Sequence, residues 1–156
     1  MKKIRCLLVD DEPLAITLLQ QHIAQVDLLE VAGTCPNGVK ALEVLRTKEV
    51  DLLFLDIRMP ALGGMELLKM LRHPPKVIIT TAYREYALDG YDLDIVDYLL
   101  KPITFDRFLK AIERFLRQIN QPAPPGVPAT VAVKPALIPI PVSSKVLKPG
   151  AVMLTS

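Results

Sequence analysis

The chain has 156 residues, of which 51% are hydrophobic and 23% charged, and its formal net charge is +2. This composition favours one folded domain with a hydrophobic core and excludes a chain that is disordered throughout. Residues 1–120 hold all 17 acidic and 16 of the 19 basic residues, so this part is nearly neutral and lacks the basic surface that binds nucleic acid.

Five short apolar runs are predicted to be β-strands, and helix-like stretches alternate with them. The runs are Ile4–Val9, Leu29–Gly33, Asp51–Leu55, Val77–Thr81 and Tyr98–Leu100. Most are apolar at consecutive positions, which is typical of parallel strands covered by helices on both faces. Five strand–helix units predict an α/β fold with a doubly wound, five-stranded parallel sheet. In such sheets, ligands bind beyond the carboxyl ends of the strands.

The predicted helices carry recognisable start signals and apolar faces. Pro13 is placed to open the first helix, and Asn37 and Thr104 are placed to cap the second and the last. Gly63-Gly64 precedes the third helix. Helical spacing predicts that the following side chains face the core from the second, third and last helices: Ala41, Leu42, Leu45, Met65, Leu68, Leu71, Phe105, Phe108, Leu109, Ile112, Phe115, Leu116 and Ile119.

The composition changes abruptly at residue 121. Eight of the 14 prolines lie in the last 36 residues, and this density of proline excludes helices and central strands. We therefore divide the chain into a folded domain at residues 1–120 and a Pro-rich linker or tail at residues 121–156, with the start of an output domain as the alternative for the second part. No window offers the roughly 18 apolar residues of a membrane span. With no signal peptide recognised either, we expect a cytoplasmic protein without a membrane partner.

The cysteines and histidines give no motif of their own. Cys6 and Cys35 fit neither a CxxC nor a metal-binding spacing, and Cys6 is expected to be a small core residue. His22 and His73 have no partner pattern. His22 lies on the first predicted helix, and we expect it to be solvated or at the edge of the core rather than a phosphoryl donor.

Polar side chains follow four of the predicted strands at the point where each strand ends. The first strand is followed by Asp10-Asp11-Glu12, the third by Asp56, and the fifth by Lys101, while the fourth ends in Thr80-Thr81. Clustered carboxylates repel one another and stay ionised only near a cation, and a few oxygen ligands suit Mg²⁺ better than Zn²⁺. The first acids could instead simply begin a helix. That alternative explains neither Asp56 nor Lys101.

These motifs, in this order, resemble the receiver domain of two-component response regulators, which has the CheY-like form of the flavodoxin-like (βα)₅ fold. The resemblance covers residues 4 to about 118. It is carried by Leu7-Leu8-Val9-Asp10-Asp11-Glu12-Pro13, Leu55-Asp56-Ile57-Arg58-Met59-Pro60 with Gly63-Gly64, Thr81-Ala82-Tyr83 and Asp97-Tyr98-Leu99-Leu100-Lys101-Pro102. It implies that Asp56 is the phosphoacceptor. It also implies that Mg²⁺ is bound by Asp10, Asp11, Asp56 and the backbone carbonyl of Arg58.

The same resemblance assigns roles around the phosphoryl group. Lys101 and the hydroxyl of Thr81 are expected to contact it, although Thr80 competes with Thr81 for that position. Tyr98 is expected to be the aromatic residue that changes rotamer on activation. The peptide bond between Lys101 and Pro102 is expected to be cis.

A narrower resemblance concerns output. The run from Thr80 to Tyr91, followed by Asp97–Ile103, resembles receivers of the LytTR (LytR/AlgR) class of transcription regulators. This implies a regulatory domain that catalyses only its own phosphoryl transfer and slow dephosphorylation, a sensor histidine kinase as partner, and homodimerisation on phosphorylation. DNA contact would need an output domain absent from these 156 residues. We expect the dimer face at the fourth helix, fifth strand and fifth helix, with candidate charged residues Arg84, Glu85, Asp97, Arg107 and Lys110.

Two other functions compete with that of a transcription regulator. A stand-alone relay or adaptor receiver that docks on a partner is the alternative to a transcription regulator. A hydrolase of the haloacid-dehalogenase type also uses an aspartate nucleophile and Mg²⁺, but such enzymes place a second aspartate two residues after the nucleophile. Arg58 occupies that position here, so this class is excluded.

Overall fold

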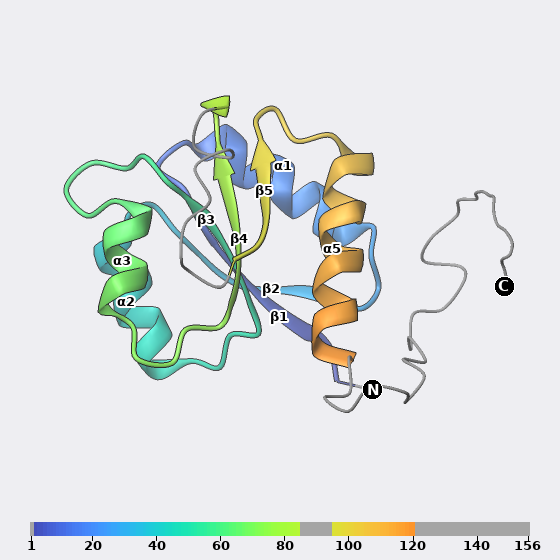
Figure 1. Ribbon diagram of the computed structural model, residues 1–156, viewed down its shortest axis with the longest axis horizontal. Helices are drawn as coiled ribbons and strands as arrows, with labels where there is room; N and C mark the ends of the chain where they lie inside the picture. The colour runs from blue at the N-terminus through green and yellow to red at the C-terminus, as the bar shows by residue number, and fades with distance from the viewer. Residues whose placement is uncertain (1, 85–94, 121–156) are drawn as a thin grey trace, which may run out of the picture. The chain divides into compact units, whose positions relative to one another are not determined.

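The structure, a computed structural model, describes residues 2–84 and 95–120 (Figure 1). In these ranges the strands are β1 (Ile4–Val9), β2 (Leu29–Cys35), β3 (Leu52–Asp56), β4 (Lys76–Thr81) and β5 (Ile95–Leu100). The helices are α1 (Pro13–Ala24), α2 (Gly38–Thr47), α3 (Gly64–Met70) and α5 (Phe105–Asn120). The predicted fourth helix falls largely on residues 85–94 and so lies outside the described residues, as does the predicted tail. The domain boundary after residue 120 therefore stays a prediction.

The sheet has the strand order β2-β1-β3-β4-β5, and all neighbouring strands are parallel. The predicted doubly wound fold is therefore confirmed. Because the chain moves from β1 to one edge and then returns to β3 at the other side of β1, the crevice at the carboxyl ends of β1 and β3 is the usual ligand position. Val9 is the register partner of Leu55, so Asp10 and Asp56 follow at the same level.

Four strands differ from the predicted ranges: β3 and β4 have ends that are shifted by one residue, whereas β2 and β5 are longer than predicted. β2 runs to Cys35 rather than Gly33, because Thr34 and Cys35 also pair with β1. β5 begins at Ile95 rather than Tyr98, and Ile95 pairs with Val77 of β4. The charge of Asp97 concealed the early start of this strand, since a carboxylate is not expected in the middle of an apolar run.

Helices cover both faces of the sheet, with α2 and α3 on one side and α1 and α5 on the other (Figure 1). On the first side, Leu67 packs in the buried cluster that includes Leu53, Leu55 and Ile79. On the second side, Phe54 of β3 stacks on Phe108 of α5 with ring centroids 5.7 Å apart. These two layers of apolar contacts hold the strand ends in place.

The helix starts were predicted correctly, whereas the inner faces of α3 and α5 were only partly correct, since Ile119 of α5 is 47% exposed. Pro13 is the first residue of α1, and Asn37 accepts a hydrogen bond from the Lys40 amide at 2.8 Å. Leu67, which was missed, is fully buried, while Leu71 ends the helix as its C-cap and is only partly buried. This seven-residue helix offers few positions from which the apolar spacing can identify the inward face.

Cys6 and Cys35 are both buried and free, as expected for Cys6. None of the helices in the described ranges has the length and apolar composition that crossing a membrane requires.

Candidate functional site

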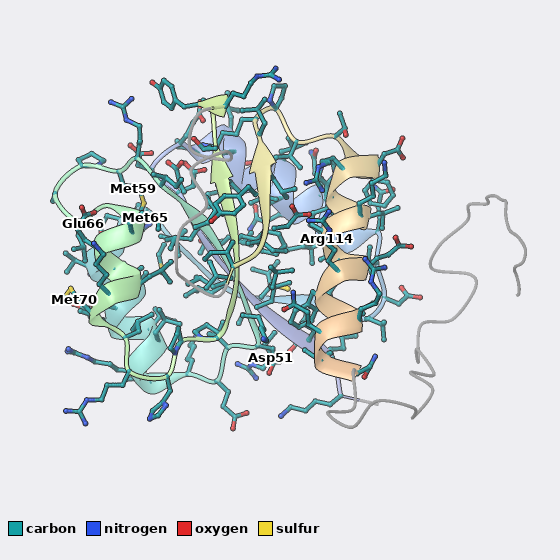
Figure 2. All side chains as sticks on the ribbon, viewed as in Figure 1. Asp51, Met59, Met65, Glu66, Met70 and Arg114 are labelled. Atoms are coloured by element: carbon teal, nitrogen blue, oxygen red, sulfur yellow. The ribbon has the colours of Figure 1, made fainter. Side chains whose placement is uncertain are left out.

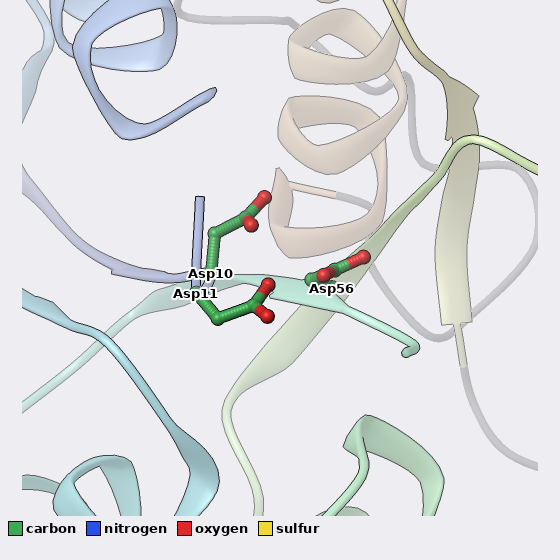
Figure 3. A group of neighbouring side chains, drawn as sticks. All are labelled: Asp10, Asp11 and Asp56. Atoms are coloured by element: carbon green, nitrogen blue, oxygen red, sulfur yellow. The ribbon is translucent and has the colours of Figure 1, made fainter. Parts of the chain in front are cut away.

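Three carboxylates meet at the carboxyl end of the sheet, two directly after β1 and one at the end of β3 (Figure 3). Asp10, Asp11 and Asp56 each offer one oxygen, and these oxygens lie within 4.8 Å of one another. Asp10 and Asp56 are only 2% and 5% exposed, whereas Asp11 is open to solvent. The structure thus brings together the three acids predicted from the sequence.

Lys101 brings a positive charge to the same point. Its Nζ atom lies 2.8 Å from Asp10 Oδ2 and 3.6 Å from Asp56 Oδ1. Its backbone amide donates to the carbonyl oxygen of Thr81 at 2.7 Å, which fixes the end of β5 against the end of β4. The peptide bond to Pro102 is cis, as expected.

Burial and the neighbouring charges shift the pKa values of Asp56 and Lys101. Burial raises the pKa of Asp56 from its ordinary 3.8 to about 6, the charge of Asp10 adds to that rise, and Lys101 opposes it. For Lys101, burial lowers the pKa, but the hydrogen bond and charge of Asp10, with the charges of Asp56 and Glu12, outweigh burial and raise it. Lys101 therefore stays cationic, while the anion of Asp56 is destabilised until a further cation or an electrophile reaches it.

An open cleft of about 550 Å³ gives access to this group. Its lining consists of Asp11, Glu12, Pro13, Asp56, Arg58, Ala82, Tyr83 and Lys101. The donor set is made only of oxygens and has room for water, so its chemistry fits a hard divalent cation such as Mg²⁺ and not a thiolate- or imidazole-bound metal. The predicted contribution of the Arg58 carbonyl stays a prediction.

A cation–π contact that was not predicted lies at the mouth of this cleft. The guanidinium carbon of Arg58 lies 4.5 Å from the ring centroid of Tyr83. The two residues come from the loops after β3 and β4, and this cation–π pair brings those loops together beside Asp56. Spacing in the sequence gives no signal for it, because the pair depends on the adjacency of the two strands.

The structure leaves open which threonine serves the site. Thr80 and Thr81 are both 1% exposed. Thr80 is the register partner of Asp56, so its side chain leaves the sheet on the same face. The hydroxyl of Thr81 accepts a hydrogen bond from the Tyr83 amide at 3.0 Å. Neither threonine is among the residues that line the described cleft, and the role of Thr81 stays a prediction.

The charged residues proposed for a dimer face need a correction. Asp97 is 5% exposed, and its oxygens accept hydrogen bonds from Arg107 at 2.8 Å and from Arg114 at 3.1 Å. Figure 2 shows Arg114 on the side of α5 that is nearer to β5. Asp97 is thus buried and paired within one chain and is not available as a partner across a two-fold axis, whereas the side chain of Arg107 is still 38% exposed. Glu85, a further member of the proposed face, lies outside the described residues.

Tyr98 is partly buried and packs against the core on the α2 and α3 side. Its backbone carbonyl accepts a hydrogen bond from Arg107 at 3.2 Å, and its amide donates to Asp97. Its predicted change of rotamer stays a prediction. His22 is buried, contrary to the solvated or core-edge position expected for it. The predicted helical pattern could not show this, because the partner of His22 is 81 residues away.

Comparison with curated proteins places these observations in a family. The model of the response regulator receiver domain matches residues 6–113. The chain is 36% identical over 147 residues to an uncharacterised response regulatory protein of Vibrio cholerae, covering 88% of this chain and 62% of that protein. It is 42% identical over 117 residues to the transcriptional regulatory protein BtsR of Salmonella typhi, covering 74% of this chain and 48% of that protein. The chain thus spans between 48% and 62% of the length of these relatives.

Comparison with solved structures gives the same family. The response regulatory domain of protein mrkE from Klebsiella pneumoniae is matched with a TM-score of 0.68 at 30% identity, over 76% of this chain and 100% of that one. Response regulator TrrA of Thermotoga maritima, in complex with Mg²⁺ and BeF, is matched with a TM-score of 0.64 at 32% identity, over 74% of this chain and 100% of that one. The chain therefore belongs to the response regulator receiver domains, the regulatory phosphoacceptor domains of two-component systems.

Proposed function

We propose that this domain accepts a phosphoryl group on Asp56 from a sensor histidine kinase and changes the conformation of its β4–β5 surface in response. The observation that carries the proposal is the position of Asp56 itself. It is a buried carboxylate at the end of β3, next to two further acids, with the Lys101 ammonium 3.6 Å away. A purely structural aspartate would be closed off from ligands, whereas Asp56, although it is paired with Lys101, lines an open cleft.

In the proposed reaction, a carboxylate oxygen of Asp56 attacks the phosphorus of a phosphohistidine or of a small acyl phosphate. The bond from phosphorus to the donor's nitrogen or oxygen breaks, and its electron pair leaves with the donor. The product is an acyl phosphate on Asp56. Lys101, whose Nζ already lies 3.6 Å from Asp56 Oδ1, would contact the transferred oxygens and offset their negative charge. Mg²⁺ held by Asp10, Asp11 and Asp56, with the Arg58 carbonyl, would supply further stabilisation of that charge.

The new phosphoryl oxygens would compete for the Thr81 hydroxyl. We propose that Thr81 gives up its hydrogen bond with the Tyr83 amide and turns to the phosphoryl group. Space next to β4 then becomes available to the ring of Tyr98. This is a two-state change that one local charge event biases.

For output, we propose control of transcription, with homodimerisation on phosphorylation, in a cytoplasmic regulator of the LytTR class. The support is the resemblance of residues 80–103 to that class and the name of BtsR as a transcriptional regulatory protein. Contact with DNA would then belong to an output domain outside these 156 residues. A stand-alone relay or adaptor receiver is the alternative. Sedimentation at tens of micromolar separates them, because a species that stays monomeric with the phosphoryl mimic beryllofluoride bound favours the adaptor.

The test of the acceptor uses a small acyl phosphate and Mg²⁺. We expect one phosphoryl group per chain, stable in acid and labile in base, and none on Asp56→Asn. The matched control is Asp51→Asn, because Asp51 directly precedes β3 at its opposite end (Figure 2) and accepts a hydrogen bond from the Arg5 amide, which asparagine can also accept. Uptake by Asp56→Asn at the wild-type rate would show that another residue is the acceptor.

A further inference from the structure

His22 of α1 makes one polar contact within the described residues, and that contact is with the segment that follows β5. Its Nε2 atom lies 2.8 Å from the backbone carbonyl oxygen of Ile103. Since a carbonyl oxygen can only accept, Nε2 carries the proton and donates. Nδ1 is buried and has no hydrogen-bond partner in the described part of the chain, so Nε2 is the ring nitrogen that makes the hydrogen bond.

Aromatic rings hold the imidazole in place. The ring centroids of Phe105 and Phe108 lie 5.4 Å and 5.3 Å from that of His22. Phe108 in turn stacks on Phe54, two residues before Asp56 in β3. The donor nitrogen of His22 is therefore fixed relative to the strand that carries Asp56.

The segment from Lys101 to Ile103 is hydrogen-bonded at both of its ends. The Lys101 amide donates to the Thr81 carbonyl at 2.7 Å, and the Ile103 carbonyl accepts from His22. Between these two points, the Lys101 side chain reaches Asp10 at 2.8 Å and Asp56 at 3.6 Å. Release of the Ile103 carbonyl frees one end of a three-residue segment, and a misplacement of about 1 Å at a reacting group can cost about a hundredfold in rate.

We propose that His22 is a positioning residue for phosphoryl transfer: its hydrogen bond to Ile103 holds the Lys101 ammonium where it can meet the charge on the phosphoryl group. The inference rests on the proposed roles of Asp56 and Lys101. A purely structural role is the competing explanation, because His22 also fills space in an aromatic cluster and satisfies a buried carbonyl. The two roles require different parts of the side chain.

Two variants separate the donor from the ring. His22→Gln keeps an N–H donor near the position of Nε2 and loses the ring, whereas His22→Phe keeps an aromatic ring and loses the donor. The rate of Asp56 phosphorylation by a small acyl phosphate is measured at saturating Mg²⁺. We expect His22→Phe to be slower by at least about tenfold and His22→Gln to keep most of the wild-type rate, within about threefold. The opposite order would overturn the proposal and assign His22 to packing.

Mg²⁺ binding and a double variant provide the specific readouts. Mg²⁺ affinity is expected not to weaken in His22→Phe, because Asp10, Asp11 and Asp56 are untouched; a large loss would show general damage and contradict the proposal. In a Lys101→Met background, His22→Phe is expected to have no further effect beyond about twofold. A full additional tenfold loss would show that His22 does not act through Lys101.

The wild-type protein gives a measurement that does not depend on the folding of any variant. The ¹⁵N shifts of the His22 ring should be those of the Nε2–H tautomer, both without ligand and with beryllofluoride and Mg²⁺. A proton on Nδ1 instead would overturn the proposal, since Nε2 could not then donate. Failure of the proposed function has a different signature, because Asp56→Asn would then be phosphorylated. If phosphorylation is confined to Asp56 and His22→Phe matches the wild type, only the inference on His22 is wrong.

Discussion

Removing the charge of Asp56 is expected to stabilise the metal-free protein at neutral and alkaline pH. Burial, with the charge of Asp10, raises the pKa of this carboxyl from 3.8 to about 6. The folded protein therefore binds the proton more tightly than the unfolded chain. The stability that the proton provides is complete below pH 3.8 and is lost as the pH rises through 6. At about 1.4 kcal/mol per pKa unit, the ionised carboxylate costs about 3 kcal/mol.

Urea unfolding of the wild type and Asp56→Asn in the presence of a chelator measures this cost between about pH 4 and pH 8. The variant is expected to match the wild type near pH 4, where the protonated carboxyl resembles the amide, and to be about 3 kcal/mol more stable near pH 8. Asp27→Asn, at an exposed position, serves as the control for the loss of a carboxylate from the surface. A difference between Asp56→Asn and wild type that is constant with pH would refute the reasoning, as would a less stable variant at pH 8.

Three further changes test the surroundings of Asp56. Asp11→Ala should weaken Mg²⁺ binding at least about tenfold in a calorimetric titration while stabilising the metal-free protein, because the charge of Asp11 also raises the pKa of Asp56; unchanged affinity would remove Asp11 from the ligands. Gly64→Ala should lower the free energy of unfolding by about 1–3 kcal/mol, since a Cβ there would lie 2.5 Å from the Asp56 carbonyl oxygen; an equally stable variant would contradict that close approach. Ala61→Gly should raise the free energy of unfolding by about 0.5–1 kcal/mol. The backbone of Ala61 is left-handed, with φ 66°, and the strain that glycine relieves there outweighs the extra conformational entropy that glycine loses on folding. A lower free energy of unfolding in urea would contradict this expectation.

The fold and the acidic site could be predicted from the sequence because each depends on short-range patterns. Consecutive apolar residues identify the strands, and the residue after each strand lies at a shared edge whenever the strands are parallel. That rule alone was enough to predict that Asp10, Asp56 and Lys101 lie at one edge of the sheet. The cis peptide before Pro102 came from the family resemblance.

The contacts that could not be predicted are those between residues far apart in the chain. Asp97 lies on β5, and its partners Arg107 and Arg114 lie 10 and 17 residues further on. His22 and Ile103 are 81 residues apart. Such pairs depend on how α1 and α5 pack on one face of the sheet, and a helical period gives the inward face without giving the neighbour.

The pairing of Asp97 also limits which conformational changes can follow phosphorylation of Asp56. Arg107 binds the Asp97 carboxylate at two points and the Tyr98 carbonyl at a third, so the backbone of β5 is tied to α5. The Asp97 carboxylate is buried, so loss of its bonds to Arg107 would remove two hydrogen bonds from a buried charge, which is costly. The proposed response to phosphorylation is therefore expected to use side chains, Thr81 and then Tyr98, while β5 and α5 stay joined. Dimerisation, if it follows, would depend on the shape that Tyr98 gives this surface and not on ion pairs made by Asp97.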